Sequence, residues 1–458
     1  MKGIKSRLSM LGFLEYAVWG SYLISMGMFI GSTGLGGQVY WFYTVQGLVS
    51  LFMPALIGII ADRFIPAQKM LSICHLIAAA AMIAAGCYCM DSMSAAAAVG
   101  APVAKAMDFA PLFTLYTISV AFYMPTVGLN NSVAFNALTK GGLDTATAFP
   151  PIRVWGTVGF IIAELMVNFV ALPGYVARPV EDTGLVSVTY ETVAIQYNYW
   201  QFFLSALLSI VLALYSLTMP NCPVNKNKKA TSIMETLGLD AFKLFKDKQM
   251  AVFFIFSMLL GVSLQLTNTY GTSFIHQFSL AGEDGWFAQN PTFLISLSQC
   301  AEAICILGVG FCLKRYGIKV VMMIAMFAWV LRFGFFGIGS TNFPGITLLI
   351  LSCIIYGVAF DFFNVSGGIY VDQKTDVKTR SSAQGLFMMM TNGIGASLGT
   401  FIAGKYIVTP RVEAPGLDAV AKLDGYKESW LIFAAYALVV YVAFYFCFHE
   451  KKDKQIAK

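Results

Sequence analysis

Long apolar stretches limit this fold more than any other feature of the sequence. Twelve of them reach the roughly 18 residues that a helix needs to cross a bilayer. Charged residues make up only 12% of the chain, about half their share in soluble domains. We therefore expect an all-α integral membrane protein of twelve transmembrane helices. The stretches lie at residues 8–31, 38–61, 67–90, 109–137, 148–172, 199–218, 249–277, 291–313, 318–339, 344–371, 381–407 and 428–448.

One long basic connection divides the twelve stretches into six and six. It predicts a bundle over 1–218, a cytoplasmic linker over 219–248, and a second bundle with a short cytoplasmic tail over 249–458. Most of the 30 Lys and Arg residues lie in the connections on the linker side, so both termini are expected in the cytoplasm. This bias explains the net charge of +6 without a nucleic-acid partner.

The linker sequence is compatible with two structures. Ser232 and Glu235 have capping-box spacing, which favours a short surface helix. A solvated linker without such a helix is the alternative. In the first case, four apolar residues would face the membrane: Ile233, Leu237, Leu244 and Phe245.

A repeated motif relates the two halves. GIIADRF at 58–64 and GFCLKRYGIK at 310–319 both place a glycine four residues before a charged pair. This resembles the loop signature of the major facilitator superfamily, which implies two pseudo-symmetric six-helix bundles with a binding site at the midplane.

Other segments predict local structure rather than chemistry. The outer loop at 173–198 has an alternating pattern typical of a small β-hairpin. Gly395, Gly399 and Gly404 are spaced for close helix packing. The nine cysteines fall mostly inside predicted helices, and the three histidines are scattered, so we expect neither a metal nor a cofactor.

Polar side chains within the predicted helices are the candidates for a binding site, because such residues are costly in a bilayer and are usually functional. Gln265 and Asn268 are three residues apart on helix seven, as are Gln299 and Glu302 on helix eight. Each pair should share one helix face. On helices five and ten, similar helical spacings are found for Arg153, Thr157 and Phe160, and for Tyr356, Phe360 and Asn364, with Asp361 one step round.

Four other polar residues receive different interpretations. His75 is interpreted as a packing histidine with satisfied hydrogen bonds, and Glu164 as a minor candidate for the site. Glu15 and Arg332 are expected near helix ends, where long side chains reach the interface and have structural roles.

The charges of the candidate site disfavour anionic ligands. Glu302 and Asp361 outnumber the single Arg153. Carboxylate and amide groups bind hydroxyls, and the aromatic rings can stack on a heterocycle. A neutral nucleoside therefore fits better than a sugar. No nucleophile and base share a helix face, which argues against an enzyme.

Several longer motifs resemble the bacterial nucleoside:proton symporter family. They include MPALIGIIADRF, FPPIRVWGTVGF, IIYGVAFDFFNVSG and SSAQGLFMMMTNGIGASLG. The resemblance implies a monomer of the inner membrane that imports nucleosides such as uridine or adenosine with protons. It also implies ten substrate-binding residues: Arg153, Thr157, Phe160, Gln265, Asn268, Gln299, Glu302, Tyr356, Phe360 and Asp361.

Asp361 is the preferred candidate for the proton carrier. It lies among phenylalanines, where desolvation disfavours the charged carboxylate. Glu302 is the alternative carrier, and a structural ion pair between Asp361 and Arg153 is the alternative role. A transporter of another neutral solute, such as a sugar or peptide, and a non-transporting nucleoside sensor are the competing functions.

Overall fold

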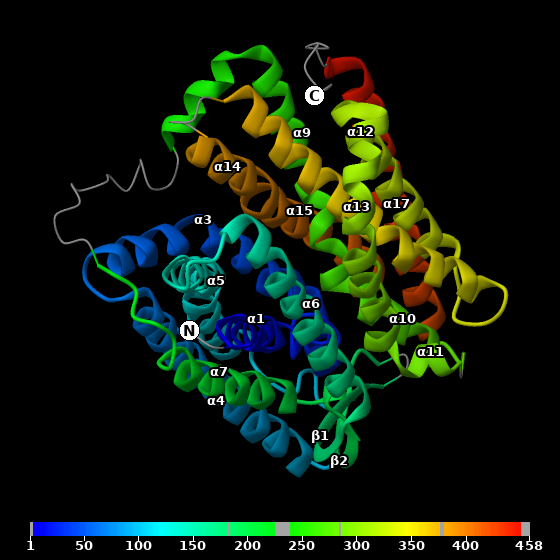
Figure 1. Cartoon of the computed structure of the whole chain (residues 1–458). Coiled ribbons are helices and arrows are strands. Elements are labelled where there is room, and N and C mark those ends of the chain that lie inside the picture. Colours follow the sequence, from blue (N-terminus) through cyan, green and yellow to red (C-terminus); the bar gives the residue numbers. More distant parts are fainter. Residues whose placement is uncertain (1–2, 181–182, 225–238, 284, 376–379, 450–458) are drawn as a thin grey trace. The chain divides into compact units, whose positions relative to one another are not determined.

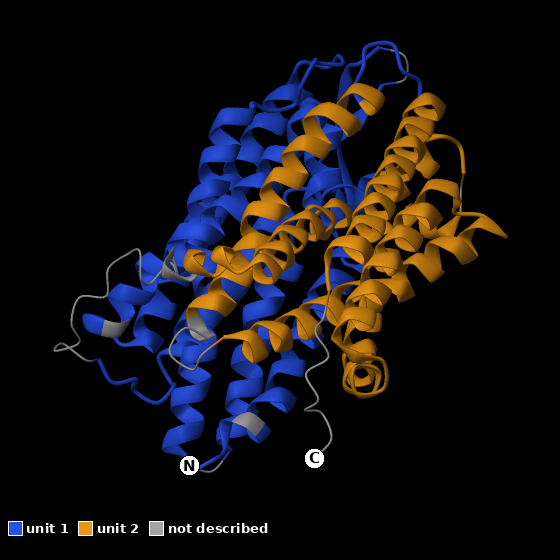
Figure 2. Ribbon diagram, turned by 90° about the horizontal axis from the view of Figure 1, so that it is seen from above, with its two compact units in different colours: residues 1–233, 268–273, 413–418 blue, residues 234–267, 274–412, 419–458 orange. Residues whose placement is uncertain are grey.

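The computed structural model of the 458-residue chain describes residues 3–180, 183–224, 239–283, 285–375 and 380–449 (Figure 1). The chain folds into two compact units, which Figure 2 shows in different colours. Unit 1 comprises residues 1–233, 268–273 and 413–418. Unit 2 comprises residues 234–267, 274–412 and 419–458.

Unit 1 is built from helices and one antiparallel hairpin. Helices dominate because backbone groups inside a bilayer must pair within their own segment. The elements are α1 (Ile4–Gly20), α2 (Met26–Ile30), η1 (Gly31–Leu35), η2 (Gly36–Gln38), α3 (Val39–Arg63), α4 (Ala67–Ala98), α5 (Phe109–Lys140), α6 (Thr145–Phe169), β1 (Ala171–Pro179), β2 (Val186–Ala194), η3 (Ile195–Tyr197) and α7 (Trp200–Ser216).

Close packing of α1 against α6 organises this unit. A Cβ atom on Gly159 would lie 2.1 Å from the carbonyl oxygen of Phe13, so only glycine permits this approach. Helix α1 also contacts α7, and α4 contacts both α5 and α7. These contacts place polar groups of α1, α4, α5 and α7 around a common interior.

The hairpin prediction is confirmed, although the strands begin earlier than expected. β1 pairs with β2 in a register that runs from Ala171 opposite Ala194 to Pro179 opposite Val186. The predicted fifth helix therefore ends at Phe169, because residues up to 172 already belong to the extended strand.

Unit 2 has a similar helical character. Asp247 begins its first long helix by accepting hydrogen bonds from the backbone N–H groups of Gln249 and Met250, at 2.8 and 3.0 Å. The elements are η4 (Leu239–Lys246), α9 (Lys248–Leu264), α10 (Leu266–Leu280), α11 (Trp286–Gln289), α12 (Pro291–Ile338), α13 (Gly345–Lys374), α14 (Arg380–Met388), η5 (Met389–Gly395), α15 (Ala396–Ile402), η6 (Ala403–Val408), α16 (Thr409–Val412) and α17 (Ala419–Cys447). Residues 268–273 of α10 are grouped with unit 1.

Each of the twelve predicted apolar stretches overlaps a helix in the described part of the chain. Within that part, nine helical segments are long and apolar enough to cross a membrane. One of them contains two predicted stretches, and the first and sixth stretches lie on α1 and α7, which have 17 residues each. Helix α12 contains the eighth and ninth, separated at Gly317, whose φ of 79° interrupts the helical backbone. The last helix begins at Ala419, nine residues before the predicted start.

The expected close packing of the glycines near the carboxyl end is confirmed for two positions. Cβ atoms on Gly395 and Gly399 would lie 2.3 Å from the carbonyl oxygen of Met258 and 2.5 Å from the Cα of Val262, both on α9.

The predicted linker helix falls largely outside the described residues. Ser232, Ile233, Glu235 and Leu237 are not described. Of the remaining pair, Phe245 lies in η4 and its ring stacks on Phe254 of α9 at 5.5 Å. This ring therefore packs against a neighbouring helix.

Candidate functional site

The predicted residues of helix five lie on α6, and two of them contact residues of α1. Gly20 permits this contact, because a Cβ atom there would lie 2.4 Å from the carbonyl oxygen of Phe160. The Phe160 ring is buried and meets Trp19 edge to face at 6.1 Å. The Arg153 guanidinium lies 4.2 Å from the centre of the Tyr16 ring. Thr157 is partly exposed on the same helix.

Helix seven differs from its prediction. Gln265 lies at a break between α9 and α10, with φ of −92° and ψ of −12°. Gln265 belongs to unit 2, and Asn268 to unit 1. Gln265 thus forms a one-residue interruption between two helices, and Asn268 lies on the second, whereas their spacing predicts one continuous helix.

The residues predicted on helices eight and ten come together where α12 packs against α13. Gly357 makes this possible, because a Cβ atom there would lie 2.5 Å from the carbonyl oxygen of Ala301 and 2.8 Å from the sulfur of Cys305. Next to this contact, the rings of Tyr356 and Phe360 stack with centroids 5.6 Å apart.

Asp361 lies beside this aromatic pair and is only 4% exposed. Glu302 is near enough to act on it electrostatically. Gln299 is also buried, at 8% exposure. Among the described residues, neither the Oδ2 atom of Asp361 nor the Oε1 atom of Gln299 has a hydrogen-bond partner. Buried acceptors without partners are costly, and a bound ligand or a proton would satisfy them.

The prediction that Arg332 reaches the interface is wrong. Its side chain is 1% exposed, and its guanidinium lies 4.4 Å from the centre of the Tyr356 ring. It donates to the Ser352 carbonyl oxygen at 2.9 Å and to the hydroxyls of Ser298 and Thr267 at 3.3 Å. Arg332 thus fixes the position of Tyr356. A signal in the sequence was compatible with this buried position, because Arg332 lies 14 residues into the predicted ninth stretch.

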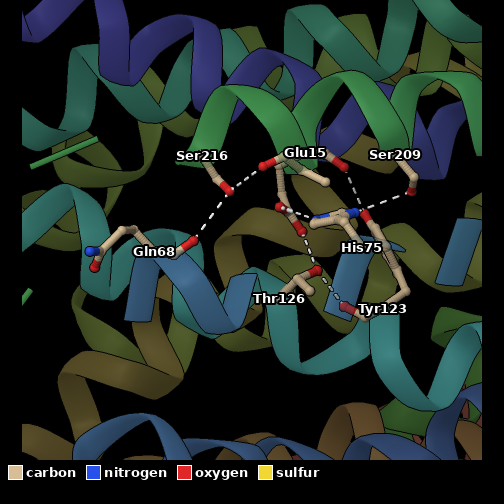
Figure 3. Close-up of polar contacts among 8 residues, drawn as sticks. Glu15, Gln68, His75, Tyr123, Thr126, Ser209 and Ser216 are labelled. Carbon is tan, nitrogen blue, oxygen red and sulfur yellow. Dashed lines mark hydrogen bonds and ion pairs between the residues drawn. The ribbon is translucent and has the colours of Figure 1, made fainter. Parts of the chain in front are cut away.

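The interface prediction for Glu15 is wrong as well. Glu15 and His75 are both 0% exposed, and the Oε2 atom of the acid lies 3.1 Å from the Nε2 atom of the imidazole. The prediction that His75 is a satisfied packing residue is confirmed, because Ser209 lies 3.1 Å from its other nitrogen (Figure 3). Glu164 on α6 is also fully buried.

Comparison with known proteins identifies the family of this chain. A family described as "Nucleoside H+ symporter" matches residues 1–453. Xanthosine permease of Escherichia coli (strain K12) is 39% identical over 459 residues, which cover 99% of this chain and 98% of that protein. Nucleoside permease NupG of the same organism is 39% identical over 98% of this chain and 96% of that protein.

The chain belongs to the nucleoside H+ symporter family. A crystal structure of the nucleoside transporter NupG is 38% identical, covers 98% of this chain and 100% of that one, and has a TM-score of 0.78. The symporter is thus a multi-pass membrane transporter that couples nucleoside import to protons, and it is not an enzyme.

The fold of the symporter is shared more widely. A bacterial homologue of the lysosomal transporter Spinster has a TM-score of 0.67 at 14% identity, over 98% of this chain and 97% of that one. At such identity the likeness concerns the fold alone. The predicted twelve-helix transport fold and the predicted family are therefore confirmed, whereas the ten substrate-binding residues stay a prediction.

Proposed function

We propose that the ten predicted residues bind the nucleoside and that Asp361 carries the coupled proton. The observation that supports this most directly lies in unit 2. There, Asp361 is buried with an unsatisfied oxygen, beside Glu302 and the stacked rings of Tyr356 and Phe360. Aromatic faces suit a nucleobase, and a carboxyl with a free acceptor suits a proton or a ribose hydroxyl.

The residues of unit 1 would complete this recognition. Arg153 can donate hydrogen bonds to a base carbonyl, Thr157 offers a hydroxyl, and Phe160 offers a ring surface. Asn268 adds an amide. In unit 2, Gln265 and Gln299 would donate to and accept from ribose hydroxyls. Because the acids of the set outnumber its single arginine, the substrates we propose are neutral nucleosides such as uridine and adenosine.

Replacing Asp361 tests its role as proton carrier. Asp361→Asn is permanently neutral, so it should lose uphill uptake driven by a pH gradient in proteoliposomes while keeping nucleoside binding and exchange. Asp372→Asn removes an acid near the end of the same helix, where Asp372 contacts Gln384 at 3.3 Å, and should keep uphill uptake. Full proton-driven uptake by Asp361→Asn would transfer the role to Glu302, and loss of exchange would favour a structural ion pair.

A competition panel tests the substrate class. Uridine, adenosine and xanthosine are offered against labelled uridine together with their free bases and monophosphates. We expect nucleosides to compete and monophosphates to fail, because a phosphate would face the acids Asp361 and Glu302 in a medium of low dielectric constant. Competition by monophosphates at similar concentration would contradict the proposed charge of the site.

We further propose that the symporter is a monomer of the bacterial inner membrane, without a cofactor and with both termini in the cytoplasm. The distribution of Lys and Arg supports this orientation. Cys447 near the carboxyl end is exposed, so a membrane-impermeant thiol reagent should reach it from the cytoplasmic face of oriented vesicles. Labelling from the opposite face would reverse the orientation.

A further inference from the structure

Another buried acid, Glu15, lies in unit 1 and is not among the ten proposed substrate-binding residues. Glu15 comes from α1, and its carboxylate contacts His75 from α4 and Thr126 from α5, while Ser209 from α7 contacts the other side of the His75 ring, as Figure 3 shows. The Oε2 atom of Glu15 lies 3.1 Å from the Nε2 atom of His75, and its Oε1 atom lies 2.6 Å from the Thr126 hydroxyl.

The hydroxyl of Thr126 can serve two protonation states of this acid. Its oxygen lies 2.6 Å from Glu15 and 2.5 Å from the carbonyl oxygen of Tyr123. A hydroxyl has one hydrogen and can also accept. When it donates to Glu15, the acid is a carboxylate. When it donates to the Tyr123 carbonyl, its oxygen is free to accept the proton of a carboxylic acid.

Ser209 gives the same freedom on the other side of the pair. Its hydroxyl lies 3.1 Å from the Nδ1 atom of His75. It can donate to a neutral imidazole or accept from an imidazolium. Both members of the pair can therefore gain or lose a proton without leaving a donor or acceptor unsatisfied, which would cost about 1–3 kcal/mol in a buried site.

The charge of the pair favours proton uptake. A carboxylate next to a neutral imidazole carries one buried negative charge. One added proton gives either a carboxylate with an imidazolium or a carboxylic acid with an imidazole, and both have no net charge. Buried net charge is costly, so the proton is held by the pair as a unit.

One cation lies among the groups around the pair, and it offsets part of the charge that favours proton uptake. Cys74 on α4 and Tyr123 on α5 interact electrostatically with Glu15. Tyr16 on α1 and Tyr22 in the turn that follows it interact with Tyr123, as does the cation of Arg153 on α6. Helix α7 contributes the hydroxyl of Ser209. Thiols and phenols are neutral near pH 7, so Arg153 is the charged group among these neighbours.

We propose that Glu15 and His75 form a proton-binding site in unit 1, distinct from Asp361 in unit 2. The proton comes from water and is shared by the carboxylate and the imidazole. Glu15 is fully buried, yet the Thr126 hydroxyl and the His75 imidazole satisfy it in both states, and the Ser209 hydroxyl does the same for His75. An acid used only to link helices requires just one of those states.

Imidazole-labelled full-length protein in nanodiscs tests the site by NMR. The chain has only three histidines, so the signal of His75 is identified by its loss in His75→Gln. The pH of the sample is varied between about 5 and about 8, and we expect this signal to change reversibly. Glu15→Gln should change the pH at which it shifts, whereas Asp361→Asn should leave that pH as in the wild type.

Two results would overturn the proposal. One is a His75 signal that stays constant over this range, and the other is a pH response that Glu15→Gln does not alter. Should Glu15→Gln fail to fold, judged by its melting temperature, Thr126→Val serves instead. It removes the hydroxyl that contacts Oε1 of Glu15 and should also change the pH response of His75. The measurement needs no nucleoside and is independent of the proposed substrate site.

Discussion

The packing of Gly357 against Ala301 offers the sharpest test of how the structure holds the proposed site. In Gly357→Ala, the new methyl carbon would lie 2.5 Å from the Ala301 carbonyl oxygen, where ordinary contacts begin at 3.4 Å. Helices α12 and α13 would have to separate by about 0.9 Å at this point. Overpacking of this kind costs about 1–3 kcal/mol.

The separation would act on the substrate site as well as on stability. Glu302 lies one residue beyond Ala301, while Tyr356 and Asp361 lie on α13 beside Gly357. A displacement of nearly 1 Å between interacting groups can reduce function about 100-fold. We expect Gly357→Ala to lower both the melting temperature and the affinity for uridine, measured by calorimetry on purified protein.

A second glycine on α13 provides the matched control. A Cβ atom on Gly368 would have its nearest contact at 3.6 Å, with the side chain of Gln384. Gly368→Ala should therefore preserve stability and uridine affinity, or raise stability slightly, because alanine favours helix by up to about 1 kcal/mol. If both variants bind and melt alike, the close approach of α12 and α13 does not support the site.

Three further results are expected. Glu302→Ala should weaken uridine binding by about 1–3 kcal/mol, because a ligand hydroxyl loses its partner, and native affinity in calorimetry would contradict this role. Arg332→Met should lower the melting temperature more than Arg332→Lys, since only the latter keeps a charge near Tyr356, and equal melting temperatures would refute the contribution of that cation. In the hairpin, hydrogen bonds from Thr189 and Arg178 hold the pKa of Glu191 below its ordinary value of 4.5. The ionised Glu191 therefore stabilises the two strands above pH 4.5, and this contribution is lost as the pH falls through the lowered pKa. Amide exchange should show this loss in the wild type but not in Arg178→Ala.

Much of the fold follows from the sequence because membrane helices have a strong signal. Arg153, Thr157 and Phe160 were expected on one helix from their spacing, and α6 contains all three. The start of the hairpin was not predictable, because Ala171 and Leu172 are apolar and continue the fifth stretch without a break. Their extended conformation depends on pairing with residues 186–194.

The polar interior was harder to predict because its contacts join distant parts of the chain. Glu15 and His75 are separated by 60 residues in the sequence, and nothing in either local pattern indicates the other. Arg332 similarly contacts Tyr356 from a different helix. The sequence around a single charged residue in an apolar stretch is the same whether its side chain reaches the membrane interface or pairs with polar groups inside the protein. Only the packing of several helices distinguishes these two locations.

The two buried acids imply two different ways for a proton to affect transport. Asp361 interacts electrostatically with Glu302, and both belong to the proposed substrate site, so a proton and a nucleoside would act on each other directly. Glu15 reaches the proposed site only through its neighbours Tyr16 and Tyr123, which interact with Arg153. Binding linkage is reciprocal. If the Glu15–His75 site is coupled to Arg153, the nucleoside affinity of Asp361→Asn should still depend in part on pH. The double variant Glu15→Gln/Asp361→Asn should then show no pH dependence of its nucleoside affinity. A pH-independent affinity in Asp361→Asn alone would show that the proton in unit 1 does not act on substrate binding.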